Sequence, residues 1–190
     1  MLSHLRPALV SMGLFTVLLG LAYPLAITGI AQAAFPDQAN GSLVRDDKGT
    51  VIGSALIGQP FATPKYLHPR PSAAGSGYDA SASSGSNMGP MNEALAQRVK
   101  TDADALRAES PGAVIPADAV TTSGSGLDPD ISPAYAHLQA TRIAKAREVP
   151  RADVEAVIDA HVQGRLLGFI GQPRVNVLAV NRALDARAPG

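Results

Sequence analysis

The chain has 190 residues, with 16 basic and 16 acidic side chains, no cysteine and no tryptophan. The lack of cysteine excludes disulfides, thiolate metal sites and a cysteine nucleophile. The charge balance argues against nucleic acid as a partner, because phosphate neutralisation requires a clustered basic surface. With only four Phe and four Tyr, we expect a core of small aliphatic side chains.

The longest uncharged stretch lies between Arg6 and Asp37 and comprises 30 residues. A transmembrane helix needs roughly 20 apolar residues to cross a hydrocarbon core of about 30 Å. We therefore expect a membrane-spanning helix at 8–33. Pro24 lies inside it, where a proline kinks a helix unless neighbouring backbone adapts.

A cleaved signal peptide is the alternative, since residues 31–33 read Ala-Gln-Ala, like a cleavage box. The apolar run is longer than the roughly 7–15 residues of a signal-peptide core, which favours a retained anchor. Arg6 on the short side places residues 1–7 in the cytoplasm. Residues 34–190 then form an extracytoplasmic domain, and 15 basic and 16 acidic residues remain once Arg6 is set aside.

The first half of this domain is predicted to be rich in loops. Residues 42–57 read as a β-hairpin whose turn, Asp-Asp-Lys-Gly, lies at 46–49. Residues 59–90 are dense in Ser, Gly, Pro and Ala and lack periodicity, which indicates a long loop. Residues 91–109 have apolar side chains at helical spacing.

The second half is predicted to be mainly helical. After a loop at 116–132, Ser132 is a helix N-cap and Pro133 the first residue of a helix that ends near Arg147. A further helix begins at Pro150, with one apolar face that extends to Leu166. A last helix covers 175–186. The fold class is therefore α+β: one transmembrane helix, then a loop-rich domain with a small β-hairpin or sheet and about four helices.

Two Ser/Gly stretches, at 83–90 and 121–130, have the composition of phosphate-binding loops. Neither ends in the Gly-Lys-Ser/Thr of a P-loop, and Pro129 replaces the third glycine of a dinucleotide fingerprint. Two interpretations stay open for these Ser/Gly stretches. They are either a scaffold inside the domain or a docking edge for a partner.

No known catalytic motif is recognisable in the sequence. There is no G-x-S-x-G elbow and no S-x-x-K pair, and the histidines lack metal-ligand spacing. A triad of a loop serine, His137 and Asp128 is conceivable, whereas Asp128 and Asp130 fit turn and cap positions better. The alternatives are a membrane-anchored or secreted serine hydrolase, or an envelope-binding module.

Motifs along nearly the whole chain resemble one family, the C subunits of Kdp-type bacterial potassium-transporting P-type ATPases. Their order and spacing carry the resemblance: Leu5-Arg6-Pro7-Ala8, Tyr23-Pro24-Leu25, Ala39-Asn40-Gly41-Ser42-Leu43, Gly53-Ser54-Ala55-Leu56-Ile57-Gly58-Gln59, Phe61, Arg70-Pro71-Ser72-Ala73, Tyr78, Gly85-Ser86-Asn87, the run 120–128, Ile131, Gln139, Arg142, Ala144, Ala146-Arg147, Gly171-Gln172-Pro173, Val175-Asn176, Asn181 and Ala183-Leu184-Asp185. Leu67 departs from it, standing where an aromatic residue is common.

The resemblance implies a subunit of the bacterial inner membrane that is not itself an enzyme and binds no cofactor or metal. ATP and magnesium would be used by a P-type pump subunit, and potassium would pass a channel-like subunit. A small single-span fourth subunit and membrane lipid complete the expected partners. This chain would assemble and stabilise the complex.

The resemblance also marks candidate interface or scaffold residues: Arg70, Ser86, Asn87, Ser123, Ser125, Asp128, Gln139, Arg142 and Asn176. A role in nucleotide affinity has been proposed for the family at the glutamine that corresponds to Gln139. The predicted topology argues against that role, because ATP is cytoplasmic and Gln139 is expected outside. No catalytic residue is expected.

Overall fold

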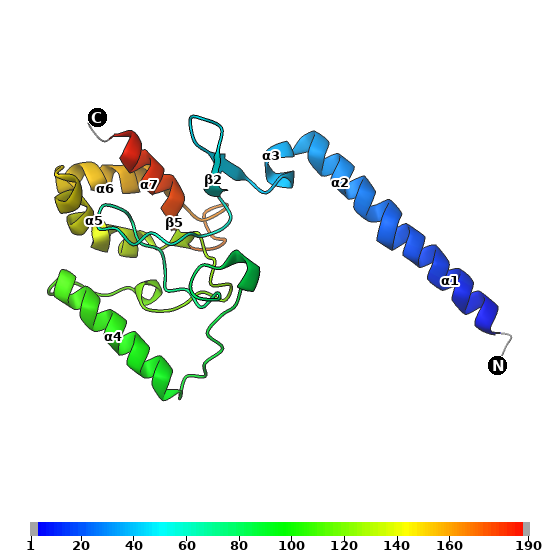
Figure 1. Cartoon of the computed structure of the whole chain (residues 1–190), viewed down its shortest axis with the longest axis horizontal. Coiled ribbons are helices and arrows are strands. Elements are labelled where there is room, and N and C mark those ends of the chain that lie inside the picture. Colours follow the sequence, from blue (N-terminus) through cyan, green and yellow to red (C-terminus); the bar gives the residue numbers. More distant parts are fainter. Residues whose placement is uncertain (1–3, 188–190) are drawn as a thin grey trace. The chain divides into compact units, whose positions relative to one another are not determined.

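The computed structural model of the protein describes residues 4–187. Within it the chain divides after Ser54 into two compact units (Figure 1). Contacts between residues are concentrated within each unit. The membrane boundaries at 8 and 33 stay predictions.

The first unit begins with one long apolar helix. It consists of α1 (Leu5–Val17), a π-helical turn η2 (Leu18–Ala22) and α2 (Tyr23–Ala34), which follow one another without a break. Its most apolar window has a mean hydropathy of 2.0, and none of that window is buried. Among residues 4–187 this is the one helix long and apolar enough to cross a membrane, which supports a single-pass membrane protein.

The π-helical turn ends two residues before Pro24 and shows how the helix accommodates this proline. A proline lacks an N–H group, and its ring clashes with the carbonyl four residues earlier. In η2 the N–H of Tyr23 bonds to the carbonyl of Leu18, five residues earlier. Such a π-helical turn relieves the crowding. The helix distortion expected at Pro24 is therefore a π-helical turn.

A short helix and a β-hairpin complete the first unit. The helix is α3 (Pro36–Ala39), and the hairpin strands β1 (Leu43–Arg45) and β2 (Val51–Ser54) pair antiparallel. The Asp46 carboxylate holds the turn by accepting hydrogen bonds from two backbone N–H groups within it. The predicted hairpin is confirmed.

The second unit contains four helices of ten residues or more among its described residues. They are α4 (Glu93–Glu109), α5 (Pro133–Arg147), α6 (Arg151–Ala160) and α7 (Val177–Ala186). Two short 3-10 turns, η3 (Ala80–Ala82) and η4 (Ala117–Ala119), lie in the loops around α4. Together with the two small sheets found among residues 4–187, these helices confirm the α+β class.

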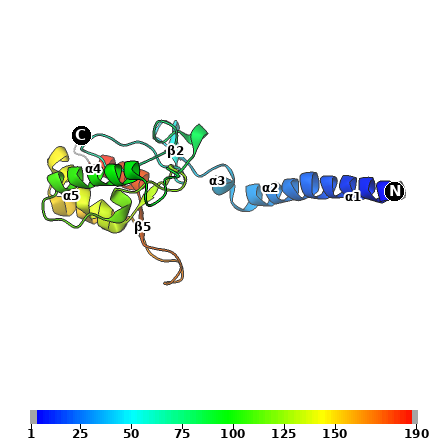
Figure 2. The same ribbon diagram turned by 90° about the horizontal axis from the view of Figure 1, so that it is seen from below.

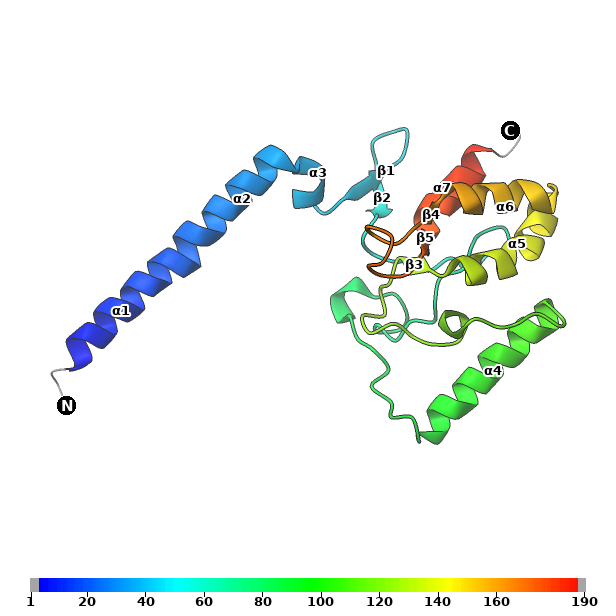
Figure 3. The same ribbon diagram turned by 180° about the vertical axis from the view of Figure 1, so that it is seen from behind.

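A three-stranded antiparallel sheet lies beside these helices (Figure 3). Its strands are β3 (Asp130–Ile131), β4 (Val162–Gln163) and β5 (Arg174–Asn176), in the order β3-β5-β4. Val175 of the central strand pairs with Ile131 on one side and Val162 on the other. A row of β-branched side chains therefore crosses the sheet, an arrangement that stabilises strand pairing.

The core of the second unit is aliphatic, as the composition predicts. α5 packs on α6, and α7 packs on α6 and β5. The largest buried apolar side chains between them come from all of these elements: Ile143, Val154, Val157, Ile158, Val175 and Val180. Leu67 joins this core from a loop and is fully buried.

Helix α5 starts as the sequence predicts. The Ser132 hydroxyl oxygen accepts a hydrogen bond from the N–H of Tyr135, and Pro133 is the first helical residue. The helix ends at Arg147, and Glu148 follows in the left-handed conformation with φ of 56°. Such a residue is a common helix terminator.

The predicted boundaries of the next two helices are wrong. α6 ends at Ala160, and the apolar residues assigned to its continuation lie in β4 and in the exposed loop that follows it. Val162 pairs with Val175 in the sheet, so Val175 belongs to a strand and α7 begins two residues later. Helical spacing persists by chance through a short strand, and pairing between segments outweighs local periodicity.

Candidate functional site

Two helices of the second unit hold a stretch of irregular backbone, residues 64–70, which we call the clamped segment. Gln139 on α5 accepts a hydrogen bond at Oε1 from the His68 N–H (2.8 Å) and donates one from Nε2 to the His68 carbonyl (3.0 Å). Asn181 on α7 makes the same pair of bonds with Leu67, at 2.7 and 3.0 Å. Both amide side chains are buried, with 4% and 1% of their surface exposed.

The two amides bond consecutive residues, and this spacing has a simple cause. In extended backbone the N–H and C=O groups of one residue point to one side, and those of the next residue point to the other. Leu67 therefore turns its backbone groups to α7, and His68 turns its own to α5. Each side-chain amide replaces a neighbouring strand, so the buried peptide groups keep their partners.

Arg142 lies one turn after Gln139 on the same face of α5. Its Nη1 donates to the carbonyls of Pro64 (2.6 Å) and Tyr66 (3.1 Å), and its Nη2 donates to Gln139 Oε1 (2.6 Å). Burial lowers the pKa of Arg142, yet a guanidinium remains charged at neutral pH. Arg142 therefore acts as a donor to the backbone of the clamped segment.

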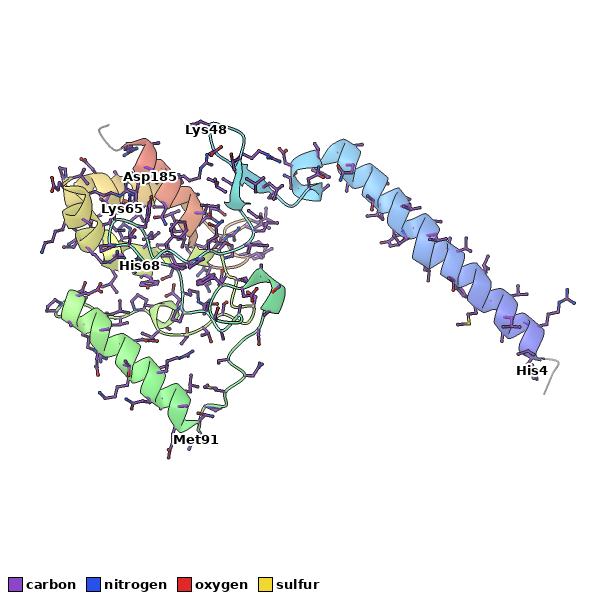
Figure 4. The ribbon with its side chains drawn as sticks, viewed as in Figure 1. His4, Lys48, Lys65, His68, Met91 and Asp185 are labelled. Carbon is purple, nitrogen blue, oxygen red and sulfur yellow. The ribbon has the colours of Figure 1, made fainter. Side chains whose placement is uncertain are left out.

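His68 is half-buried beside this arginine, on the loop near α5 (Figure 4). Its Nε2 lies 3.2 Å from Arg142 Nη1 and 3.1 Å from the Thr63 carbonyl oxygen. Burial and the Arg142 charge lower the pKa of His68, because a second positive charge here is unfavourable. The neutral imidazole is the form that fits the folded domain.

Arg147, at the end of α5, fixes the first part of the clamped segment. Its Nε donates to the Lys65 carbonyl (2.7 Å), and its Nη2 pairs with Asp185 Oδ1 (2.8 Å). The Arg147 guanidinium lies 5.2 Å from the centre of the Tyr66 ring, whose hydroxyl donates to Asp185 Oδ2 (2.9 Å). Lys65 and Asp185 accordingly lie in the same region of the second unit (Figure 4).

Arg70, at the other end of the clamped segment, is joined to the second Ser/Gly stretch. Its Nη1 pairs with Asp128 Oδ2 at 2.9 Å, and 22% and 30% of the two side chains are exposed. Its Nη2 lies 3.3 Å from the Thr122 carbonyl, and its own carbonyl accepts the Tyr78 hydroxyl at 2.6 Å. Burial and the Asp128 carboxylate raise the pKa of Tyr78, so this phenol stays a neutral donor.

The two Ser/Gly stretches lie against each other. The N–H of Ser84 donates to the Ser125 carbonyl at 3.0 Å. A Cβ added to Gly85 would lie 3.0 Å from the Gly124 carbonyl oxygen. Glycine therefore permits a close approach of two backbones, which supports the scaffold interpretation of these stretches.

Gly126 is the most crowded glycine of the second stretch. Its φ is 67°, and an added Cβ would lie 2.6 Å from the Ala74 nitrogen. Its carbonyl accepts the Ser72 hydroxyl (2.6 Å), and its N–H donates to Ser123 Oγ (2.9 Å). Both serine hydroxyls therefore have partners in the fold.

Asn176 joins β5 to α7. Its Oδ1 accepts the N–H of Ala179 (3.0 Å) as a helix cap, and its Nδ2 donates to Asp130 Oδ1 (3.2 Å) and the Ala55 carbonyl (3.1 Å). Burial raises the pKa of Asp130, although Arg174 pairs with its other oxygen at 2.9 Å. Asn176 thus holds two strands and a helix start together.

The nine predicted candidates fall into three sets. Two pairs lie in the groups above: Arg70 with Asp128, and Gln139 with Arg142. Three more make turn or cap hydrogen bonds: Ser123, Ser125 and Asn176. The last two, Ser86 and Asn87, belong to neither group; Ser86 is half-buried, and Asn87 is exposed with φ of 52°.

The conceivable serine triad is not assembled in the structure. Asp128 pairs with Arg70, whereas His137 Nε2 lies 3.0 Å from Asp159 Oδ1. Within residues 4–187 there is no group of three or more His, Asp or Glu side chains that could hold a metal ion.

Several residues of these groups were not predicted as candidates, among them His68, Tyr78, Arg147 and Asn181. Asn181 had the clearest signal, because it lies among Val177, Val180 and Leu184 on the apolar face of α7. A buried amide in such a position needs hydrogen-bond partners. Tyr78 was indicated only by its place among the motifs of the resemblance, and His68 by no signal, since both lie in loops without periodicity.

These features define a class: a single-span membrane protein with a small α+β domain whose buried polar side chains brace its own backbone. Residues 5–186 match the family model described as "KdpC: K+-transporting ATPase, c chain". The potassium-transporting ATPase KdpC subunit of Caulobacter vibrioides (strain NA1000 / CB15N) is 79% identical over 189 residues, covering 100% of this chain and 96% of that relative. Its counterpart in Bradyrhizobium diazoefficiens is 54% identical over 200 residues, covering 99% of each. The chain belongs to the KdpC family, the C subunits of potassium-transporting ATPases.

Proposed function

We propose that this chain is a non-catalytic subunit that assembles and stabilises a potassium-transporting complex. Its partners are a channel-like potassium-translocating subunit, a P-type pump subunit and a small single-span subunit. ATP and magnesium act on the pump subunit. The observation that carries the proposal is that Arg70, Gln139 and Arg142 direct their hydrogen bonds to groups of their own domain.

The proposed topology is a single pass through the bacterial inner membrane, with surrounding lipid. Arg6 favours a cytoplasmic location for the residues before the helix, and the second unit lies outside. The near balance of 16 basic and 16 acidic residues is consistent with a protein partner rather than a polyanion.

The geometry of Gln139 supports a scaffold role over a nucleotide role. Its Oε1 accepts from both His68 and Arg142, which uses the two lone pairs of an amide oxygen. Its Nε2 is bonded to the His68 carbonyl. A nucleotide that contacted this amide oxygen would have to displace bonds that hold a buried backbone.

Co-purification tests the proposal directly. Detergent extraction of the tagged chain is expected to recover a pump subunit and a channel-like subunit, and a solitary chain contradicts the proposal. Deletion of the second unit is expected to abolish potassium-dependent ATPase activity through loss of assembly. Normal potassium-stimulated turnover by the remaining anchor would overturn this role.

A substitution at Gln139 separates the scaffold role from a nucleotide role. In assembled complex, Gln139→Ala is expected to leave the ATP concentration dependence unchanged while lowering the yield of complex. Gln139→Glu keeps an acceptor oxygen for the His68 N–H and Arg142 but loses the Nε2 donor, and it is expected to retain more complex than Gln139→Ala. The exposed Gln97→Ala is the control. A large shift in ATP dependence in either Gln139 variant refutes the scaffold role.

A further inference from the structure

The loop between β4 and β5, residues 164–173, leaves the body of the second unit as an extended hairpin (Figure 2). Its backbone is internally paired: Leu166 and Ile170 exchange two hydrogen bonds of 3.0 Å. Every residue from 163 to 174 is exposed. We call this segment the apolar hairpin. Because its peptide groups bond to one another, its side chains are the groups available for contact with another molecule.

Four large apolar side chains occupy the end of the apolar hairpin. The exposed fractions of Leu166, Leu167, Phe169 and Ile170 are 66%, 77%, 71% and 47%. Single exposed apolar residues are ordinary, but a contiguous group marks an interaction surface. The sequence between His161 and Pro173 contains one charge, Arg165, so nothing in the hairpin itself offsets this apolar character.

The backbone at the tip carries strain that a smaller residue would avoid. Leu167 has φ of 52° and Gly168 has φ of 82°. Glycine or asparagine is the usual residue in the left-handed region, where a branched apolar residue is unfavourable. A leucine at this corner gains little from packing within its own domain, because 77% of it is exposed. Strained residues of this kind cluster at binding positions.

The polar groups around the hairpin favour a protein over a lipid surface as its partner. A segment that lies in a bilayer interface keeps basic side chains available for anionic headgroups. Here Arg165 Nη2 donates to Gln172 Oε1 at 2.9 Å, and Arg174 pairs with Asp130 at 2.9 Å. An apolar centre with a hydrogen-bonded polar rim is the arrangement of a protein interface.

We infer that the apolar hairpin is an anchor that inserts into an apolar pocket on a partner subunit of the same potassium-transporting complex. This inference rests on the proposed function, since membership of the family implies partner subunits. One hairpin is too small for a whole interface of about 800 Å² per partner. It therefore supplies the few central side chains that dominate binding inside a larger contact.

Site-specific crosslinking in the assembled complex tests the inference. Because the chain has no cysteine, a single Leu167→Cys or Phe169→Cys substitution carries one photoreactive label. Val114→Cys is the matched control, since Val114 is an apolar residue with 90% exposure elsewhere in the second unit. The hairpin labels are expected to crosslink to a partner subunit and the control label is not, because central anchor side chains lie in desolvated pockets of an interface.

The species that crosslink to the hairpin labels distinguish the possible outcomes. Crosslinks to lipid alone, crosslinks to a second copy of this chain, or yields equal to that at Val114 overturn the inference while the proposed function stands, provided the complex co-purifies. A chain that co-purifies with no partner overturns both. Crosslinks to a partner subunit from both hairpin positions support it.

A charge at the tip provides an independent measurement. Leu167→Asp is expected to lower retention of the chain in the complex by about tenfold or more, because truncation of a central anchor typically costs at least that much. Val114→Asp is expected to have no effect. Thermal unfolding of the variant alone in detergent is expected to show no loss of stability, since 77% of Leu167 is exposed and aspartate tolerates the left-handed conformation. Unchanged retention of Leu167→Asp contradicts the inference.

Discussion

The clamped segment and the apolar hairpin are both stretches outside the main helices, and they use their residues in opposite ways. In the clamped segment, buried side chains from α5 and α7 satisfy the backbone, and Leu67 enters the core. In the apolar hairpin the backbone satisfies itself, and the apolar side chains remain exposed. Irregular backbone is thus rigid scaffold in one place and a contact surface in the other.

This contrast separates stability from assembly. Substitutions in the clamped segment or its partners should change the free energy of unfolding and should affect the complex only through the fold. Substitutions in the apolar hairpin should change assembly and leave the fold intact. The following expectations, from the largest effect to the smallest, test that separation.

Asn181→Ala is expected to have the largest effect on stability. It leaves the buried N–H and C=O groups of Leu67 without partners, and each such group costs about 1–3 kcal/mol. We therefore expect a loss of about 4 kcal/mol, measured by denaturant unfolding of the full chain in detergent. The exposed Gln97→Ala should be neutral. A loss below about 1 kcal/mol would show that the clamp contributes little.

Gly126→Ala tests the close approach of the two Ser/Gly stretches. The new Cβ would lie 2.6 Å from the Ala74 nitrogen at a φ of 67°, so both overlap and backbone strain act against it. We expect a loss of about 3 kcal/mol in the same assay. Gly124→Ala is the matched control, since its Cβ would meet nothing within 4 Å. Equal effects at the two glycines would contradict the scaffold interpretation.

Protonation of His68 is expected to change the free energy of unfolding by less than these two substitutions do, and in a pH-dependent way. Its pKa in the folded domain is lowered by burial and Arg142, so near its ordinary value of about 6.5 the unfolded chain binds the proton more readily. Stability is therefore expected to fall as the pH drops below that value. His68→Gln should reduce this decline in thermal unfolding measured between neutral and mildly acidic pH. An identical pH profile for both proteins would refute the lowered pKa.

Leu167→Asn should produce the smallest change, and in the opposite direction. Asparagine tolerates the left-handed conformation better than leucine, so the chain alone is expected to gain about 0.5–1 kcal/mol. Leu166→Asn, at a residue without positive φ, should give no such gain. If Leu167→Asn destabilised the chain, the tip leucine would have a structural role inside its own domain.

Local patterns in the sequence predicted much of the fold. The 30-residue uncharged run predicted the long helix, and Ser132 with Pro133 predicted the start of α5, because both signals are local. The three-stranded sheet could not be read in the same way. Its strands have two or three residues each and are defined by pairing between distant segments.

Only part of the candidate site was predicted, again because local patterns can be read from the sequence and contacts between distant segments cannot. Gln139 and Arg142 are three residues apart on one helix, so their grouping follows from helical geometry. Their target is backbone about 70 residues earlier in the chain. No pattern in the sequence predicts which backbone groups these two side chains bind. The apolar hairpin was missed because Val162 and Leu166 continue a helical period that the sheet interrupts.

Hydrogen exchange of the chain alone and in the complex tests the central claim most directly. We expect the amide hydrogens of Tyr66, Leu67 and His68, which have hydrogen-bond partners, to be protected in the chain alone, and we expect ATP to leave this protection unchanged. The amide hydrogens of residues 164–172 are expected to exchange more slowly in the complex than in the chain alone, because a partner subunit excludes solvent from the apolar hairpin. Protection of Tyr66, Leu67 and His68 that depends on ATP, or equal exchange of residues 164–172 in both states, would contradict the account.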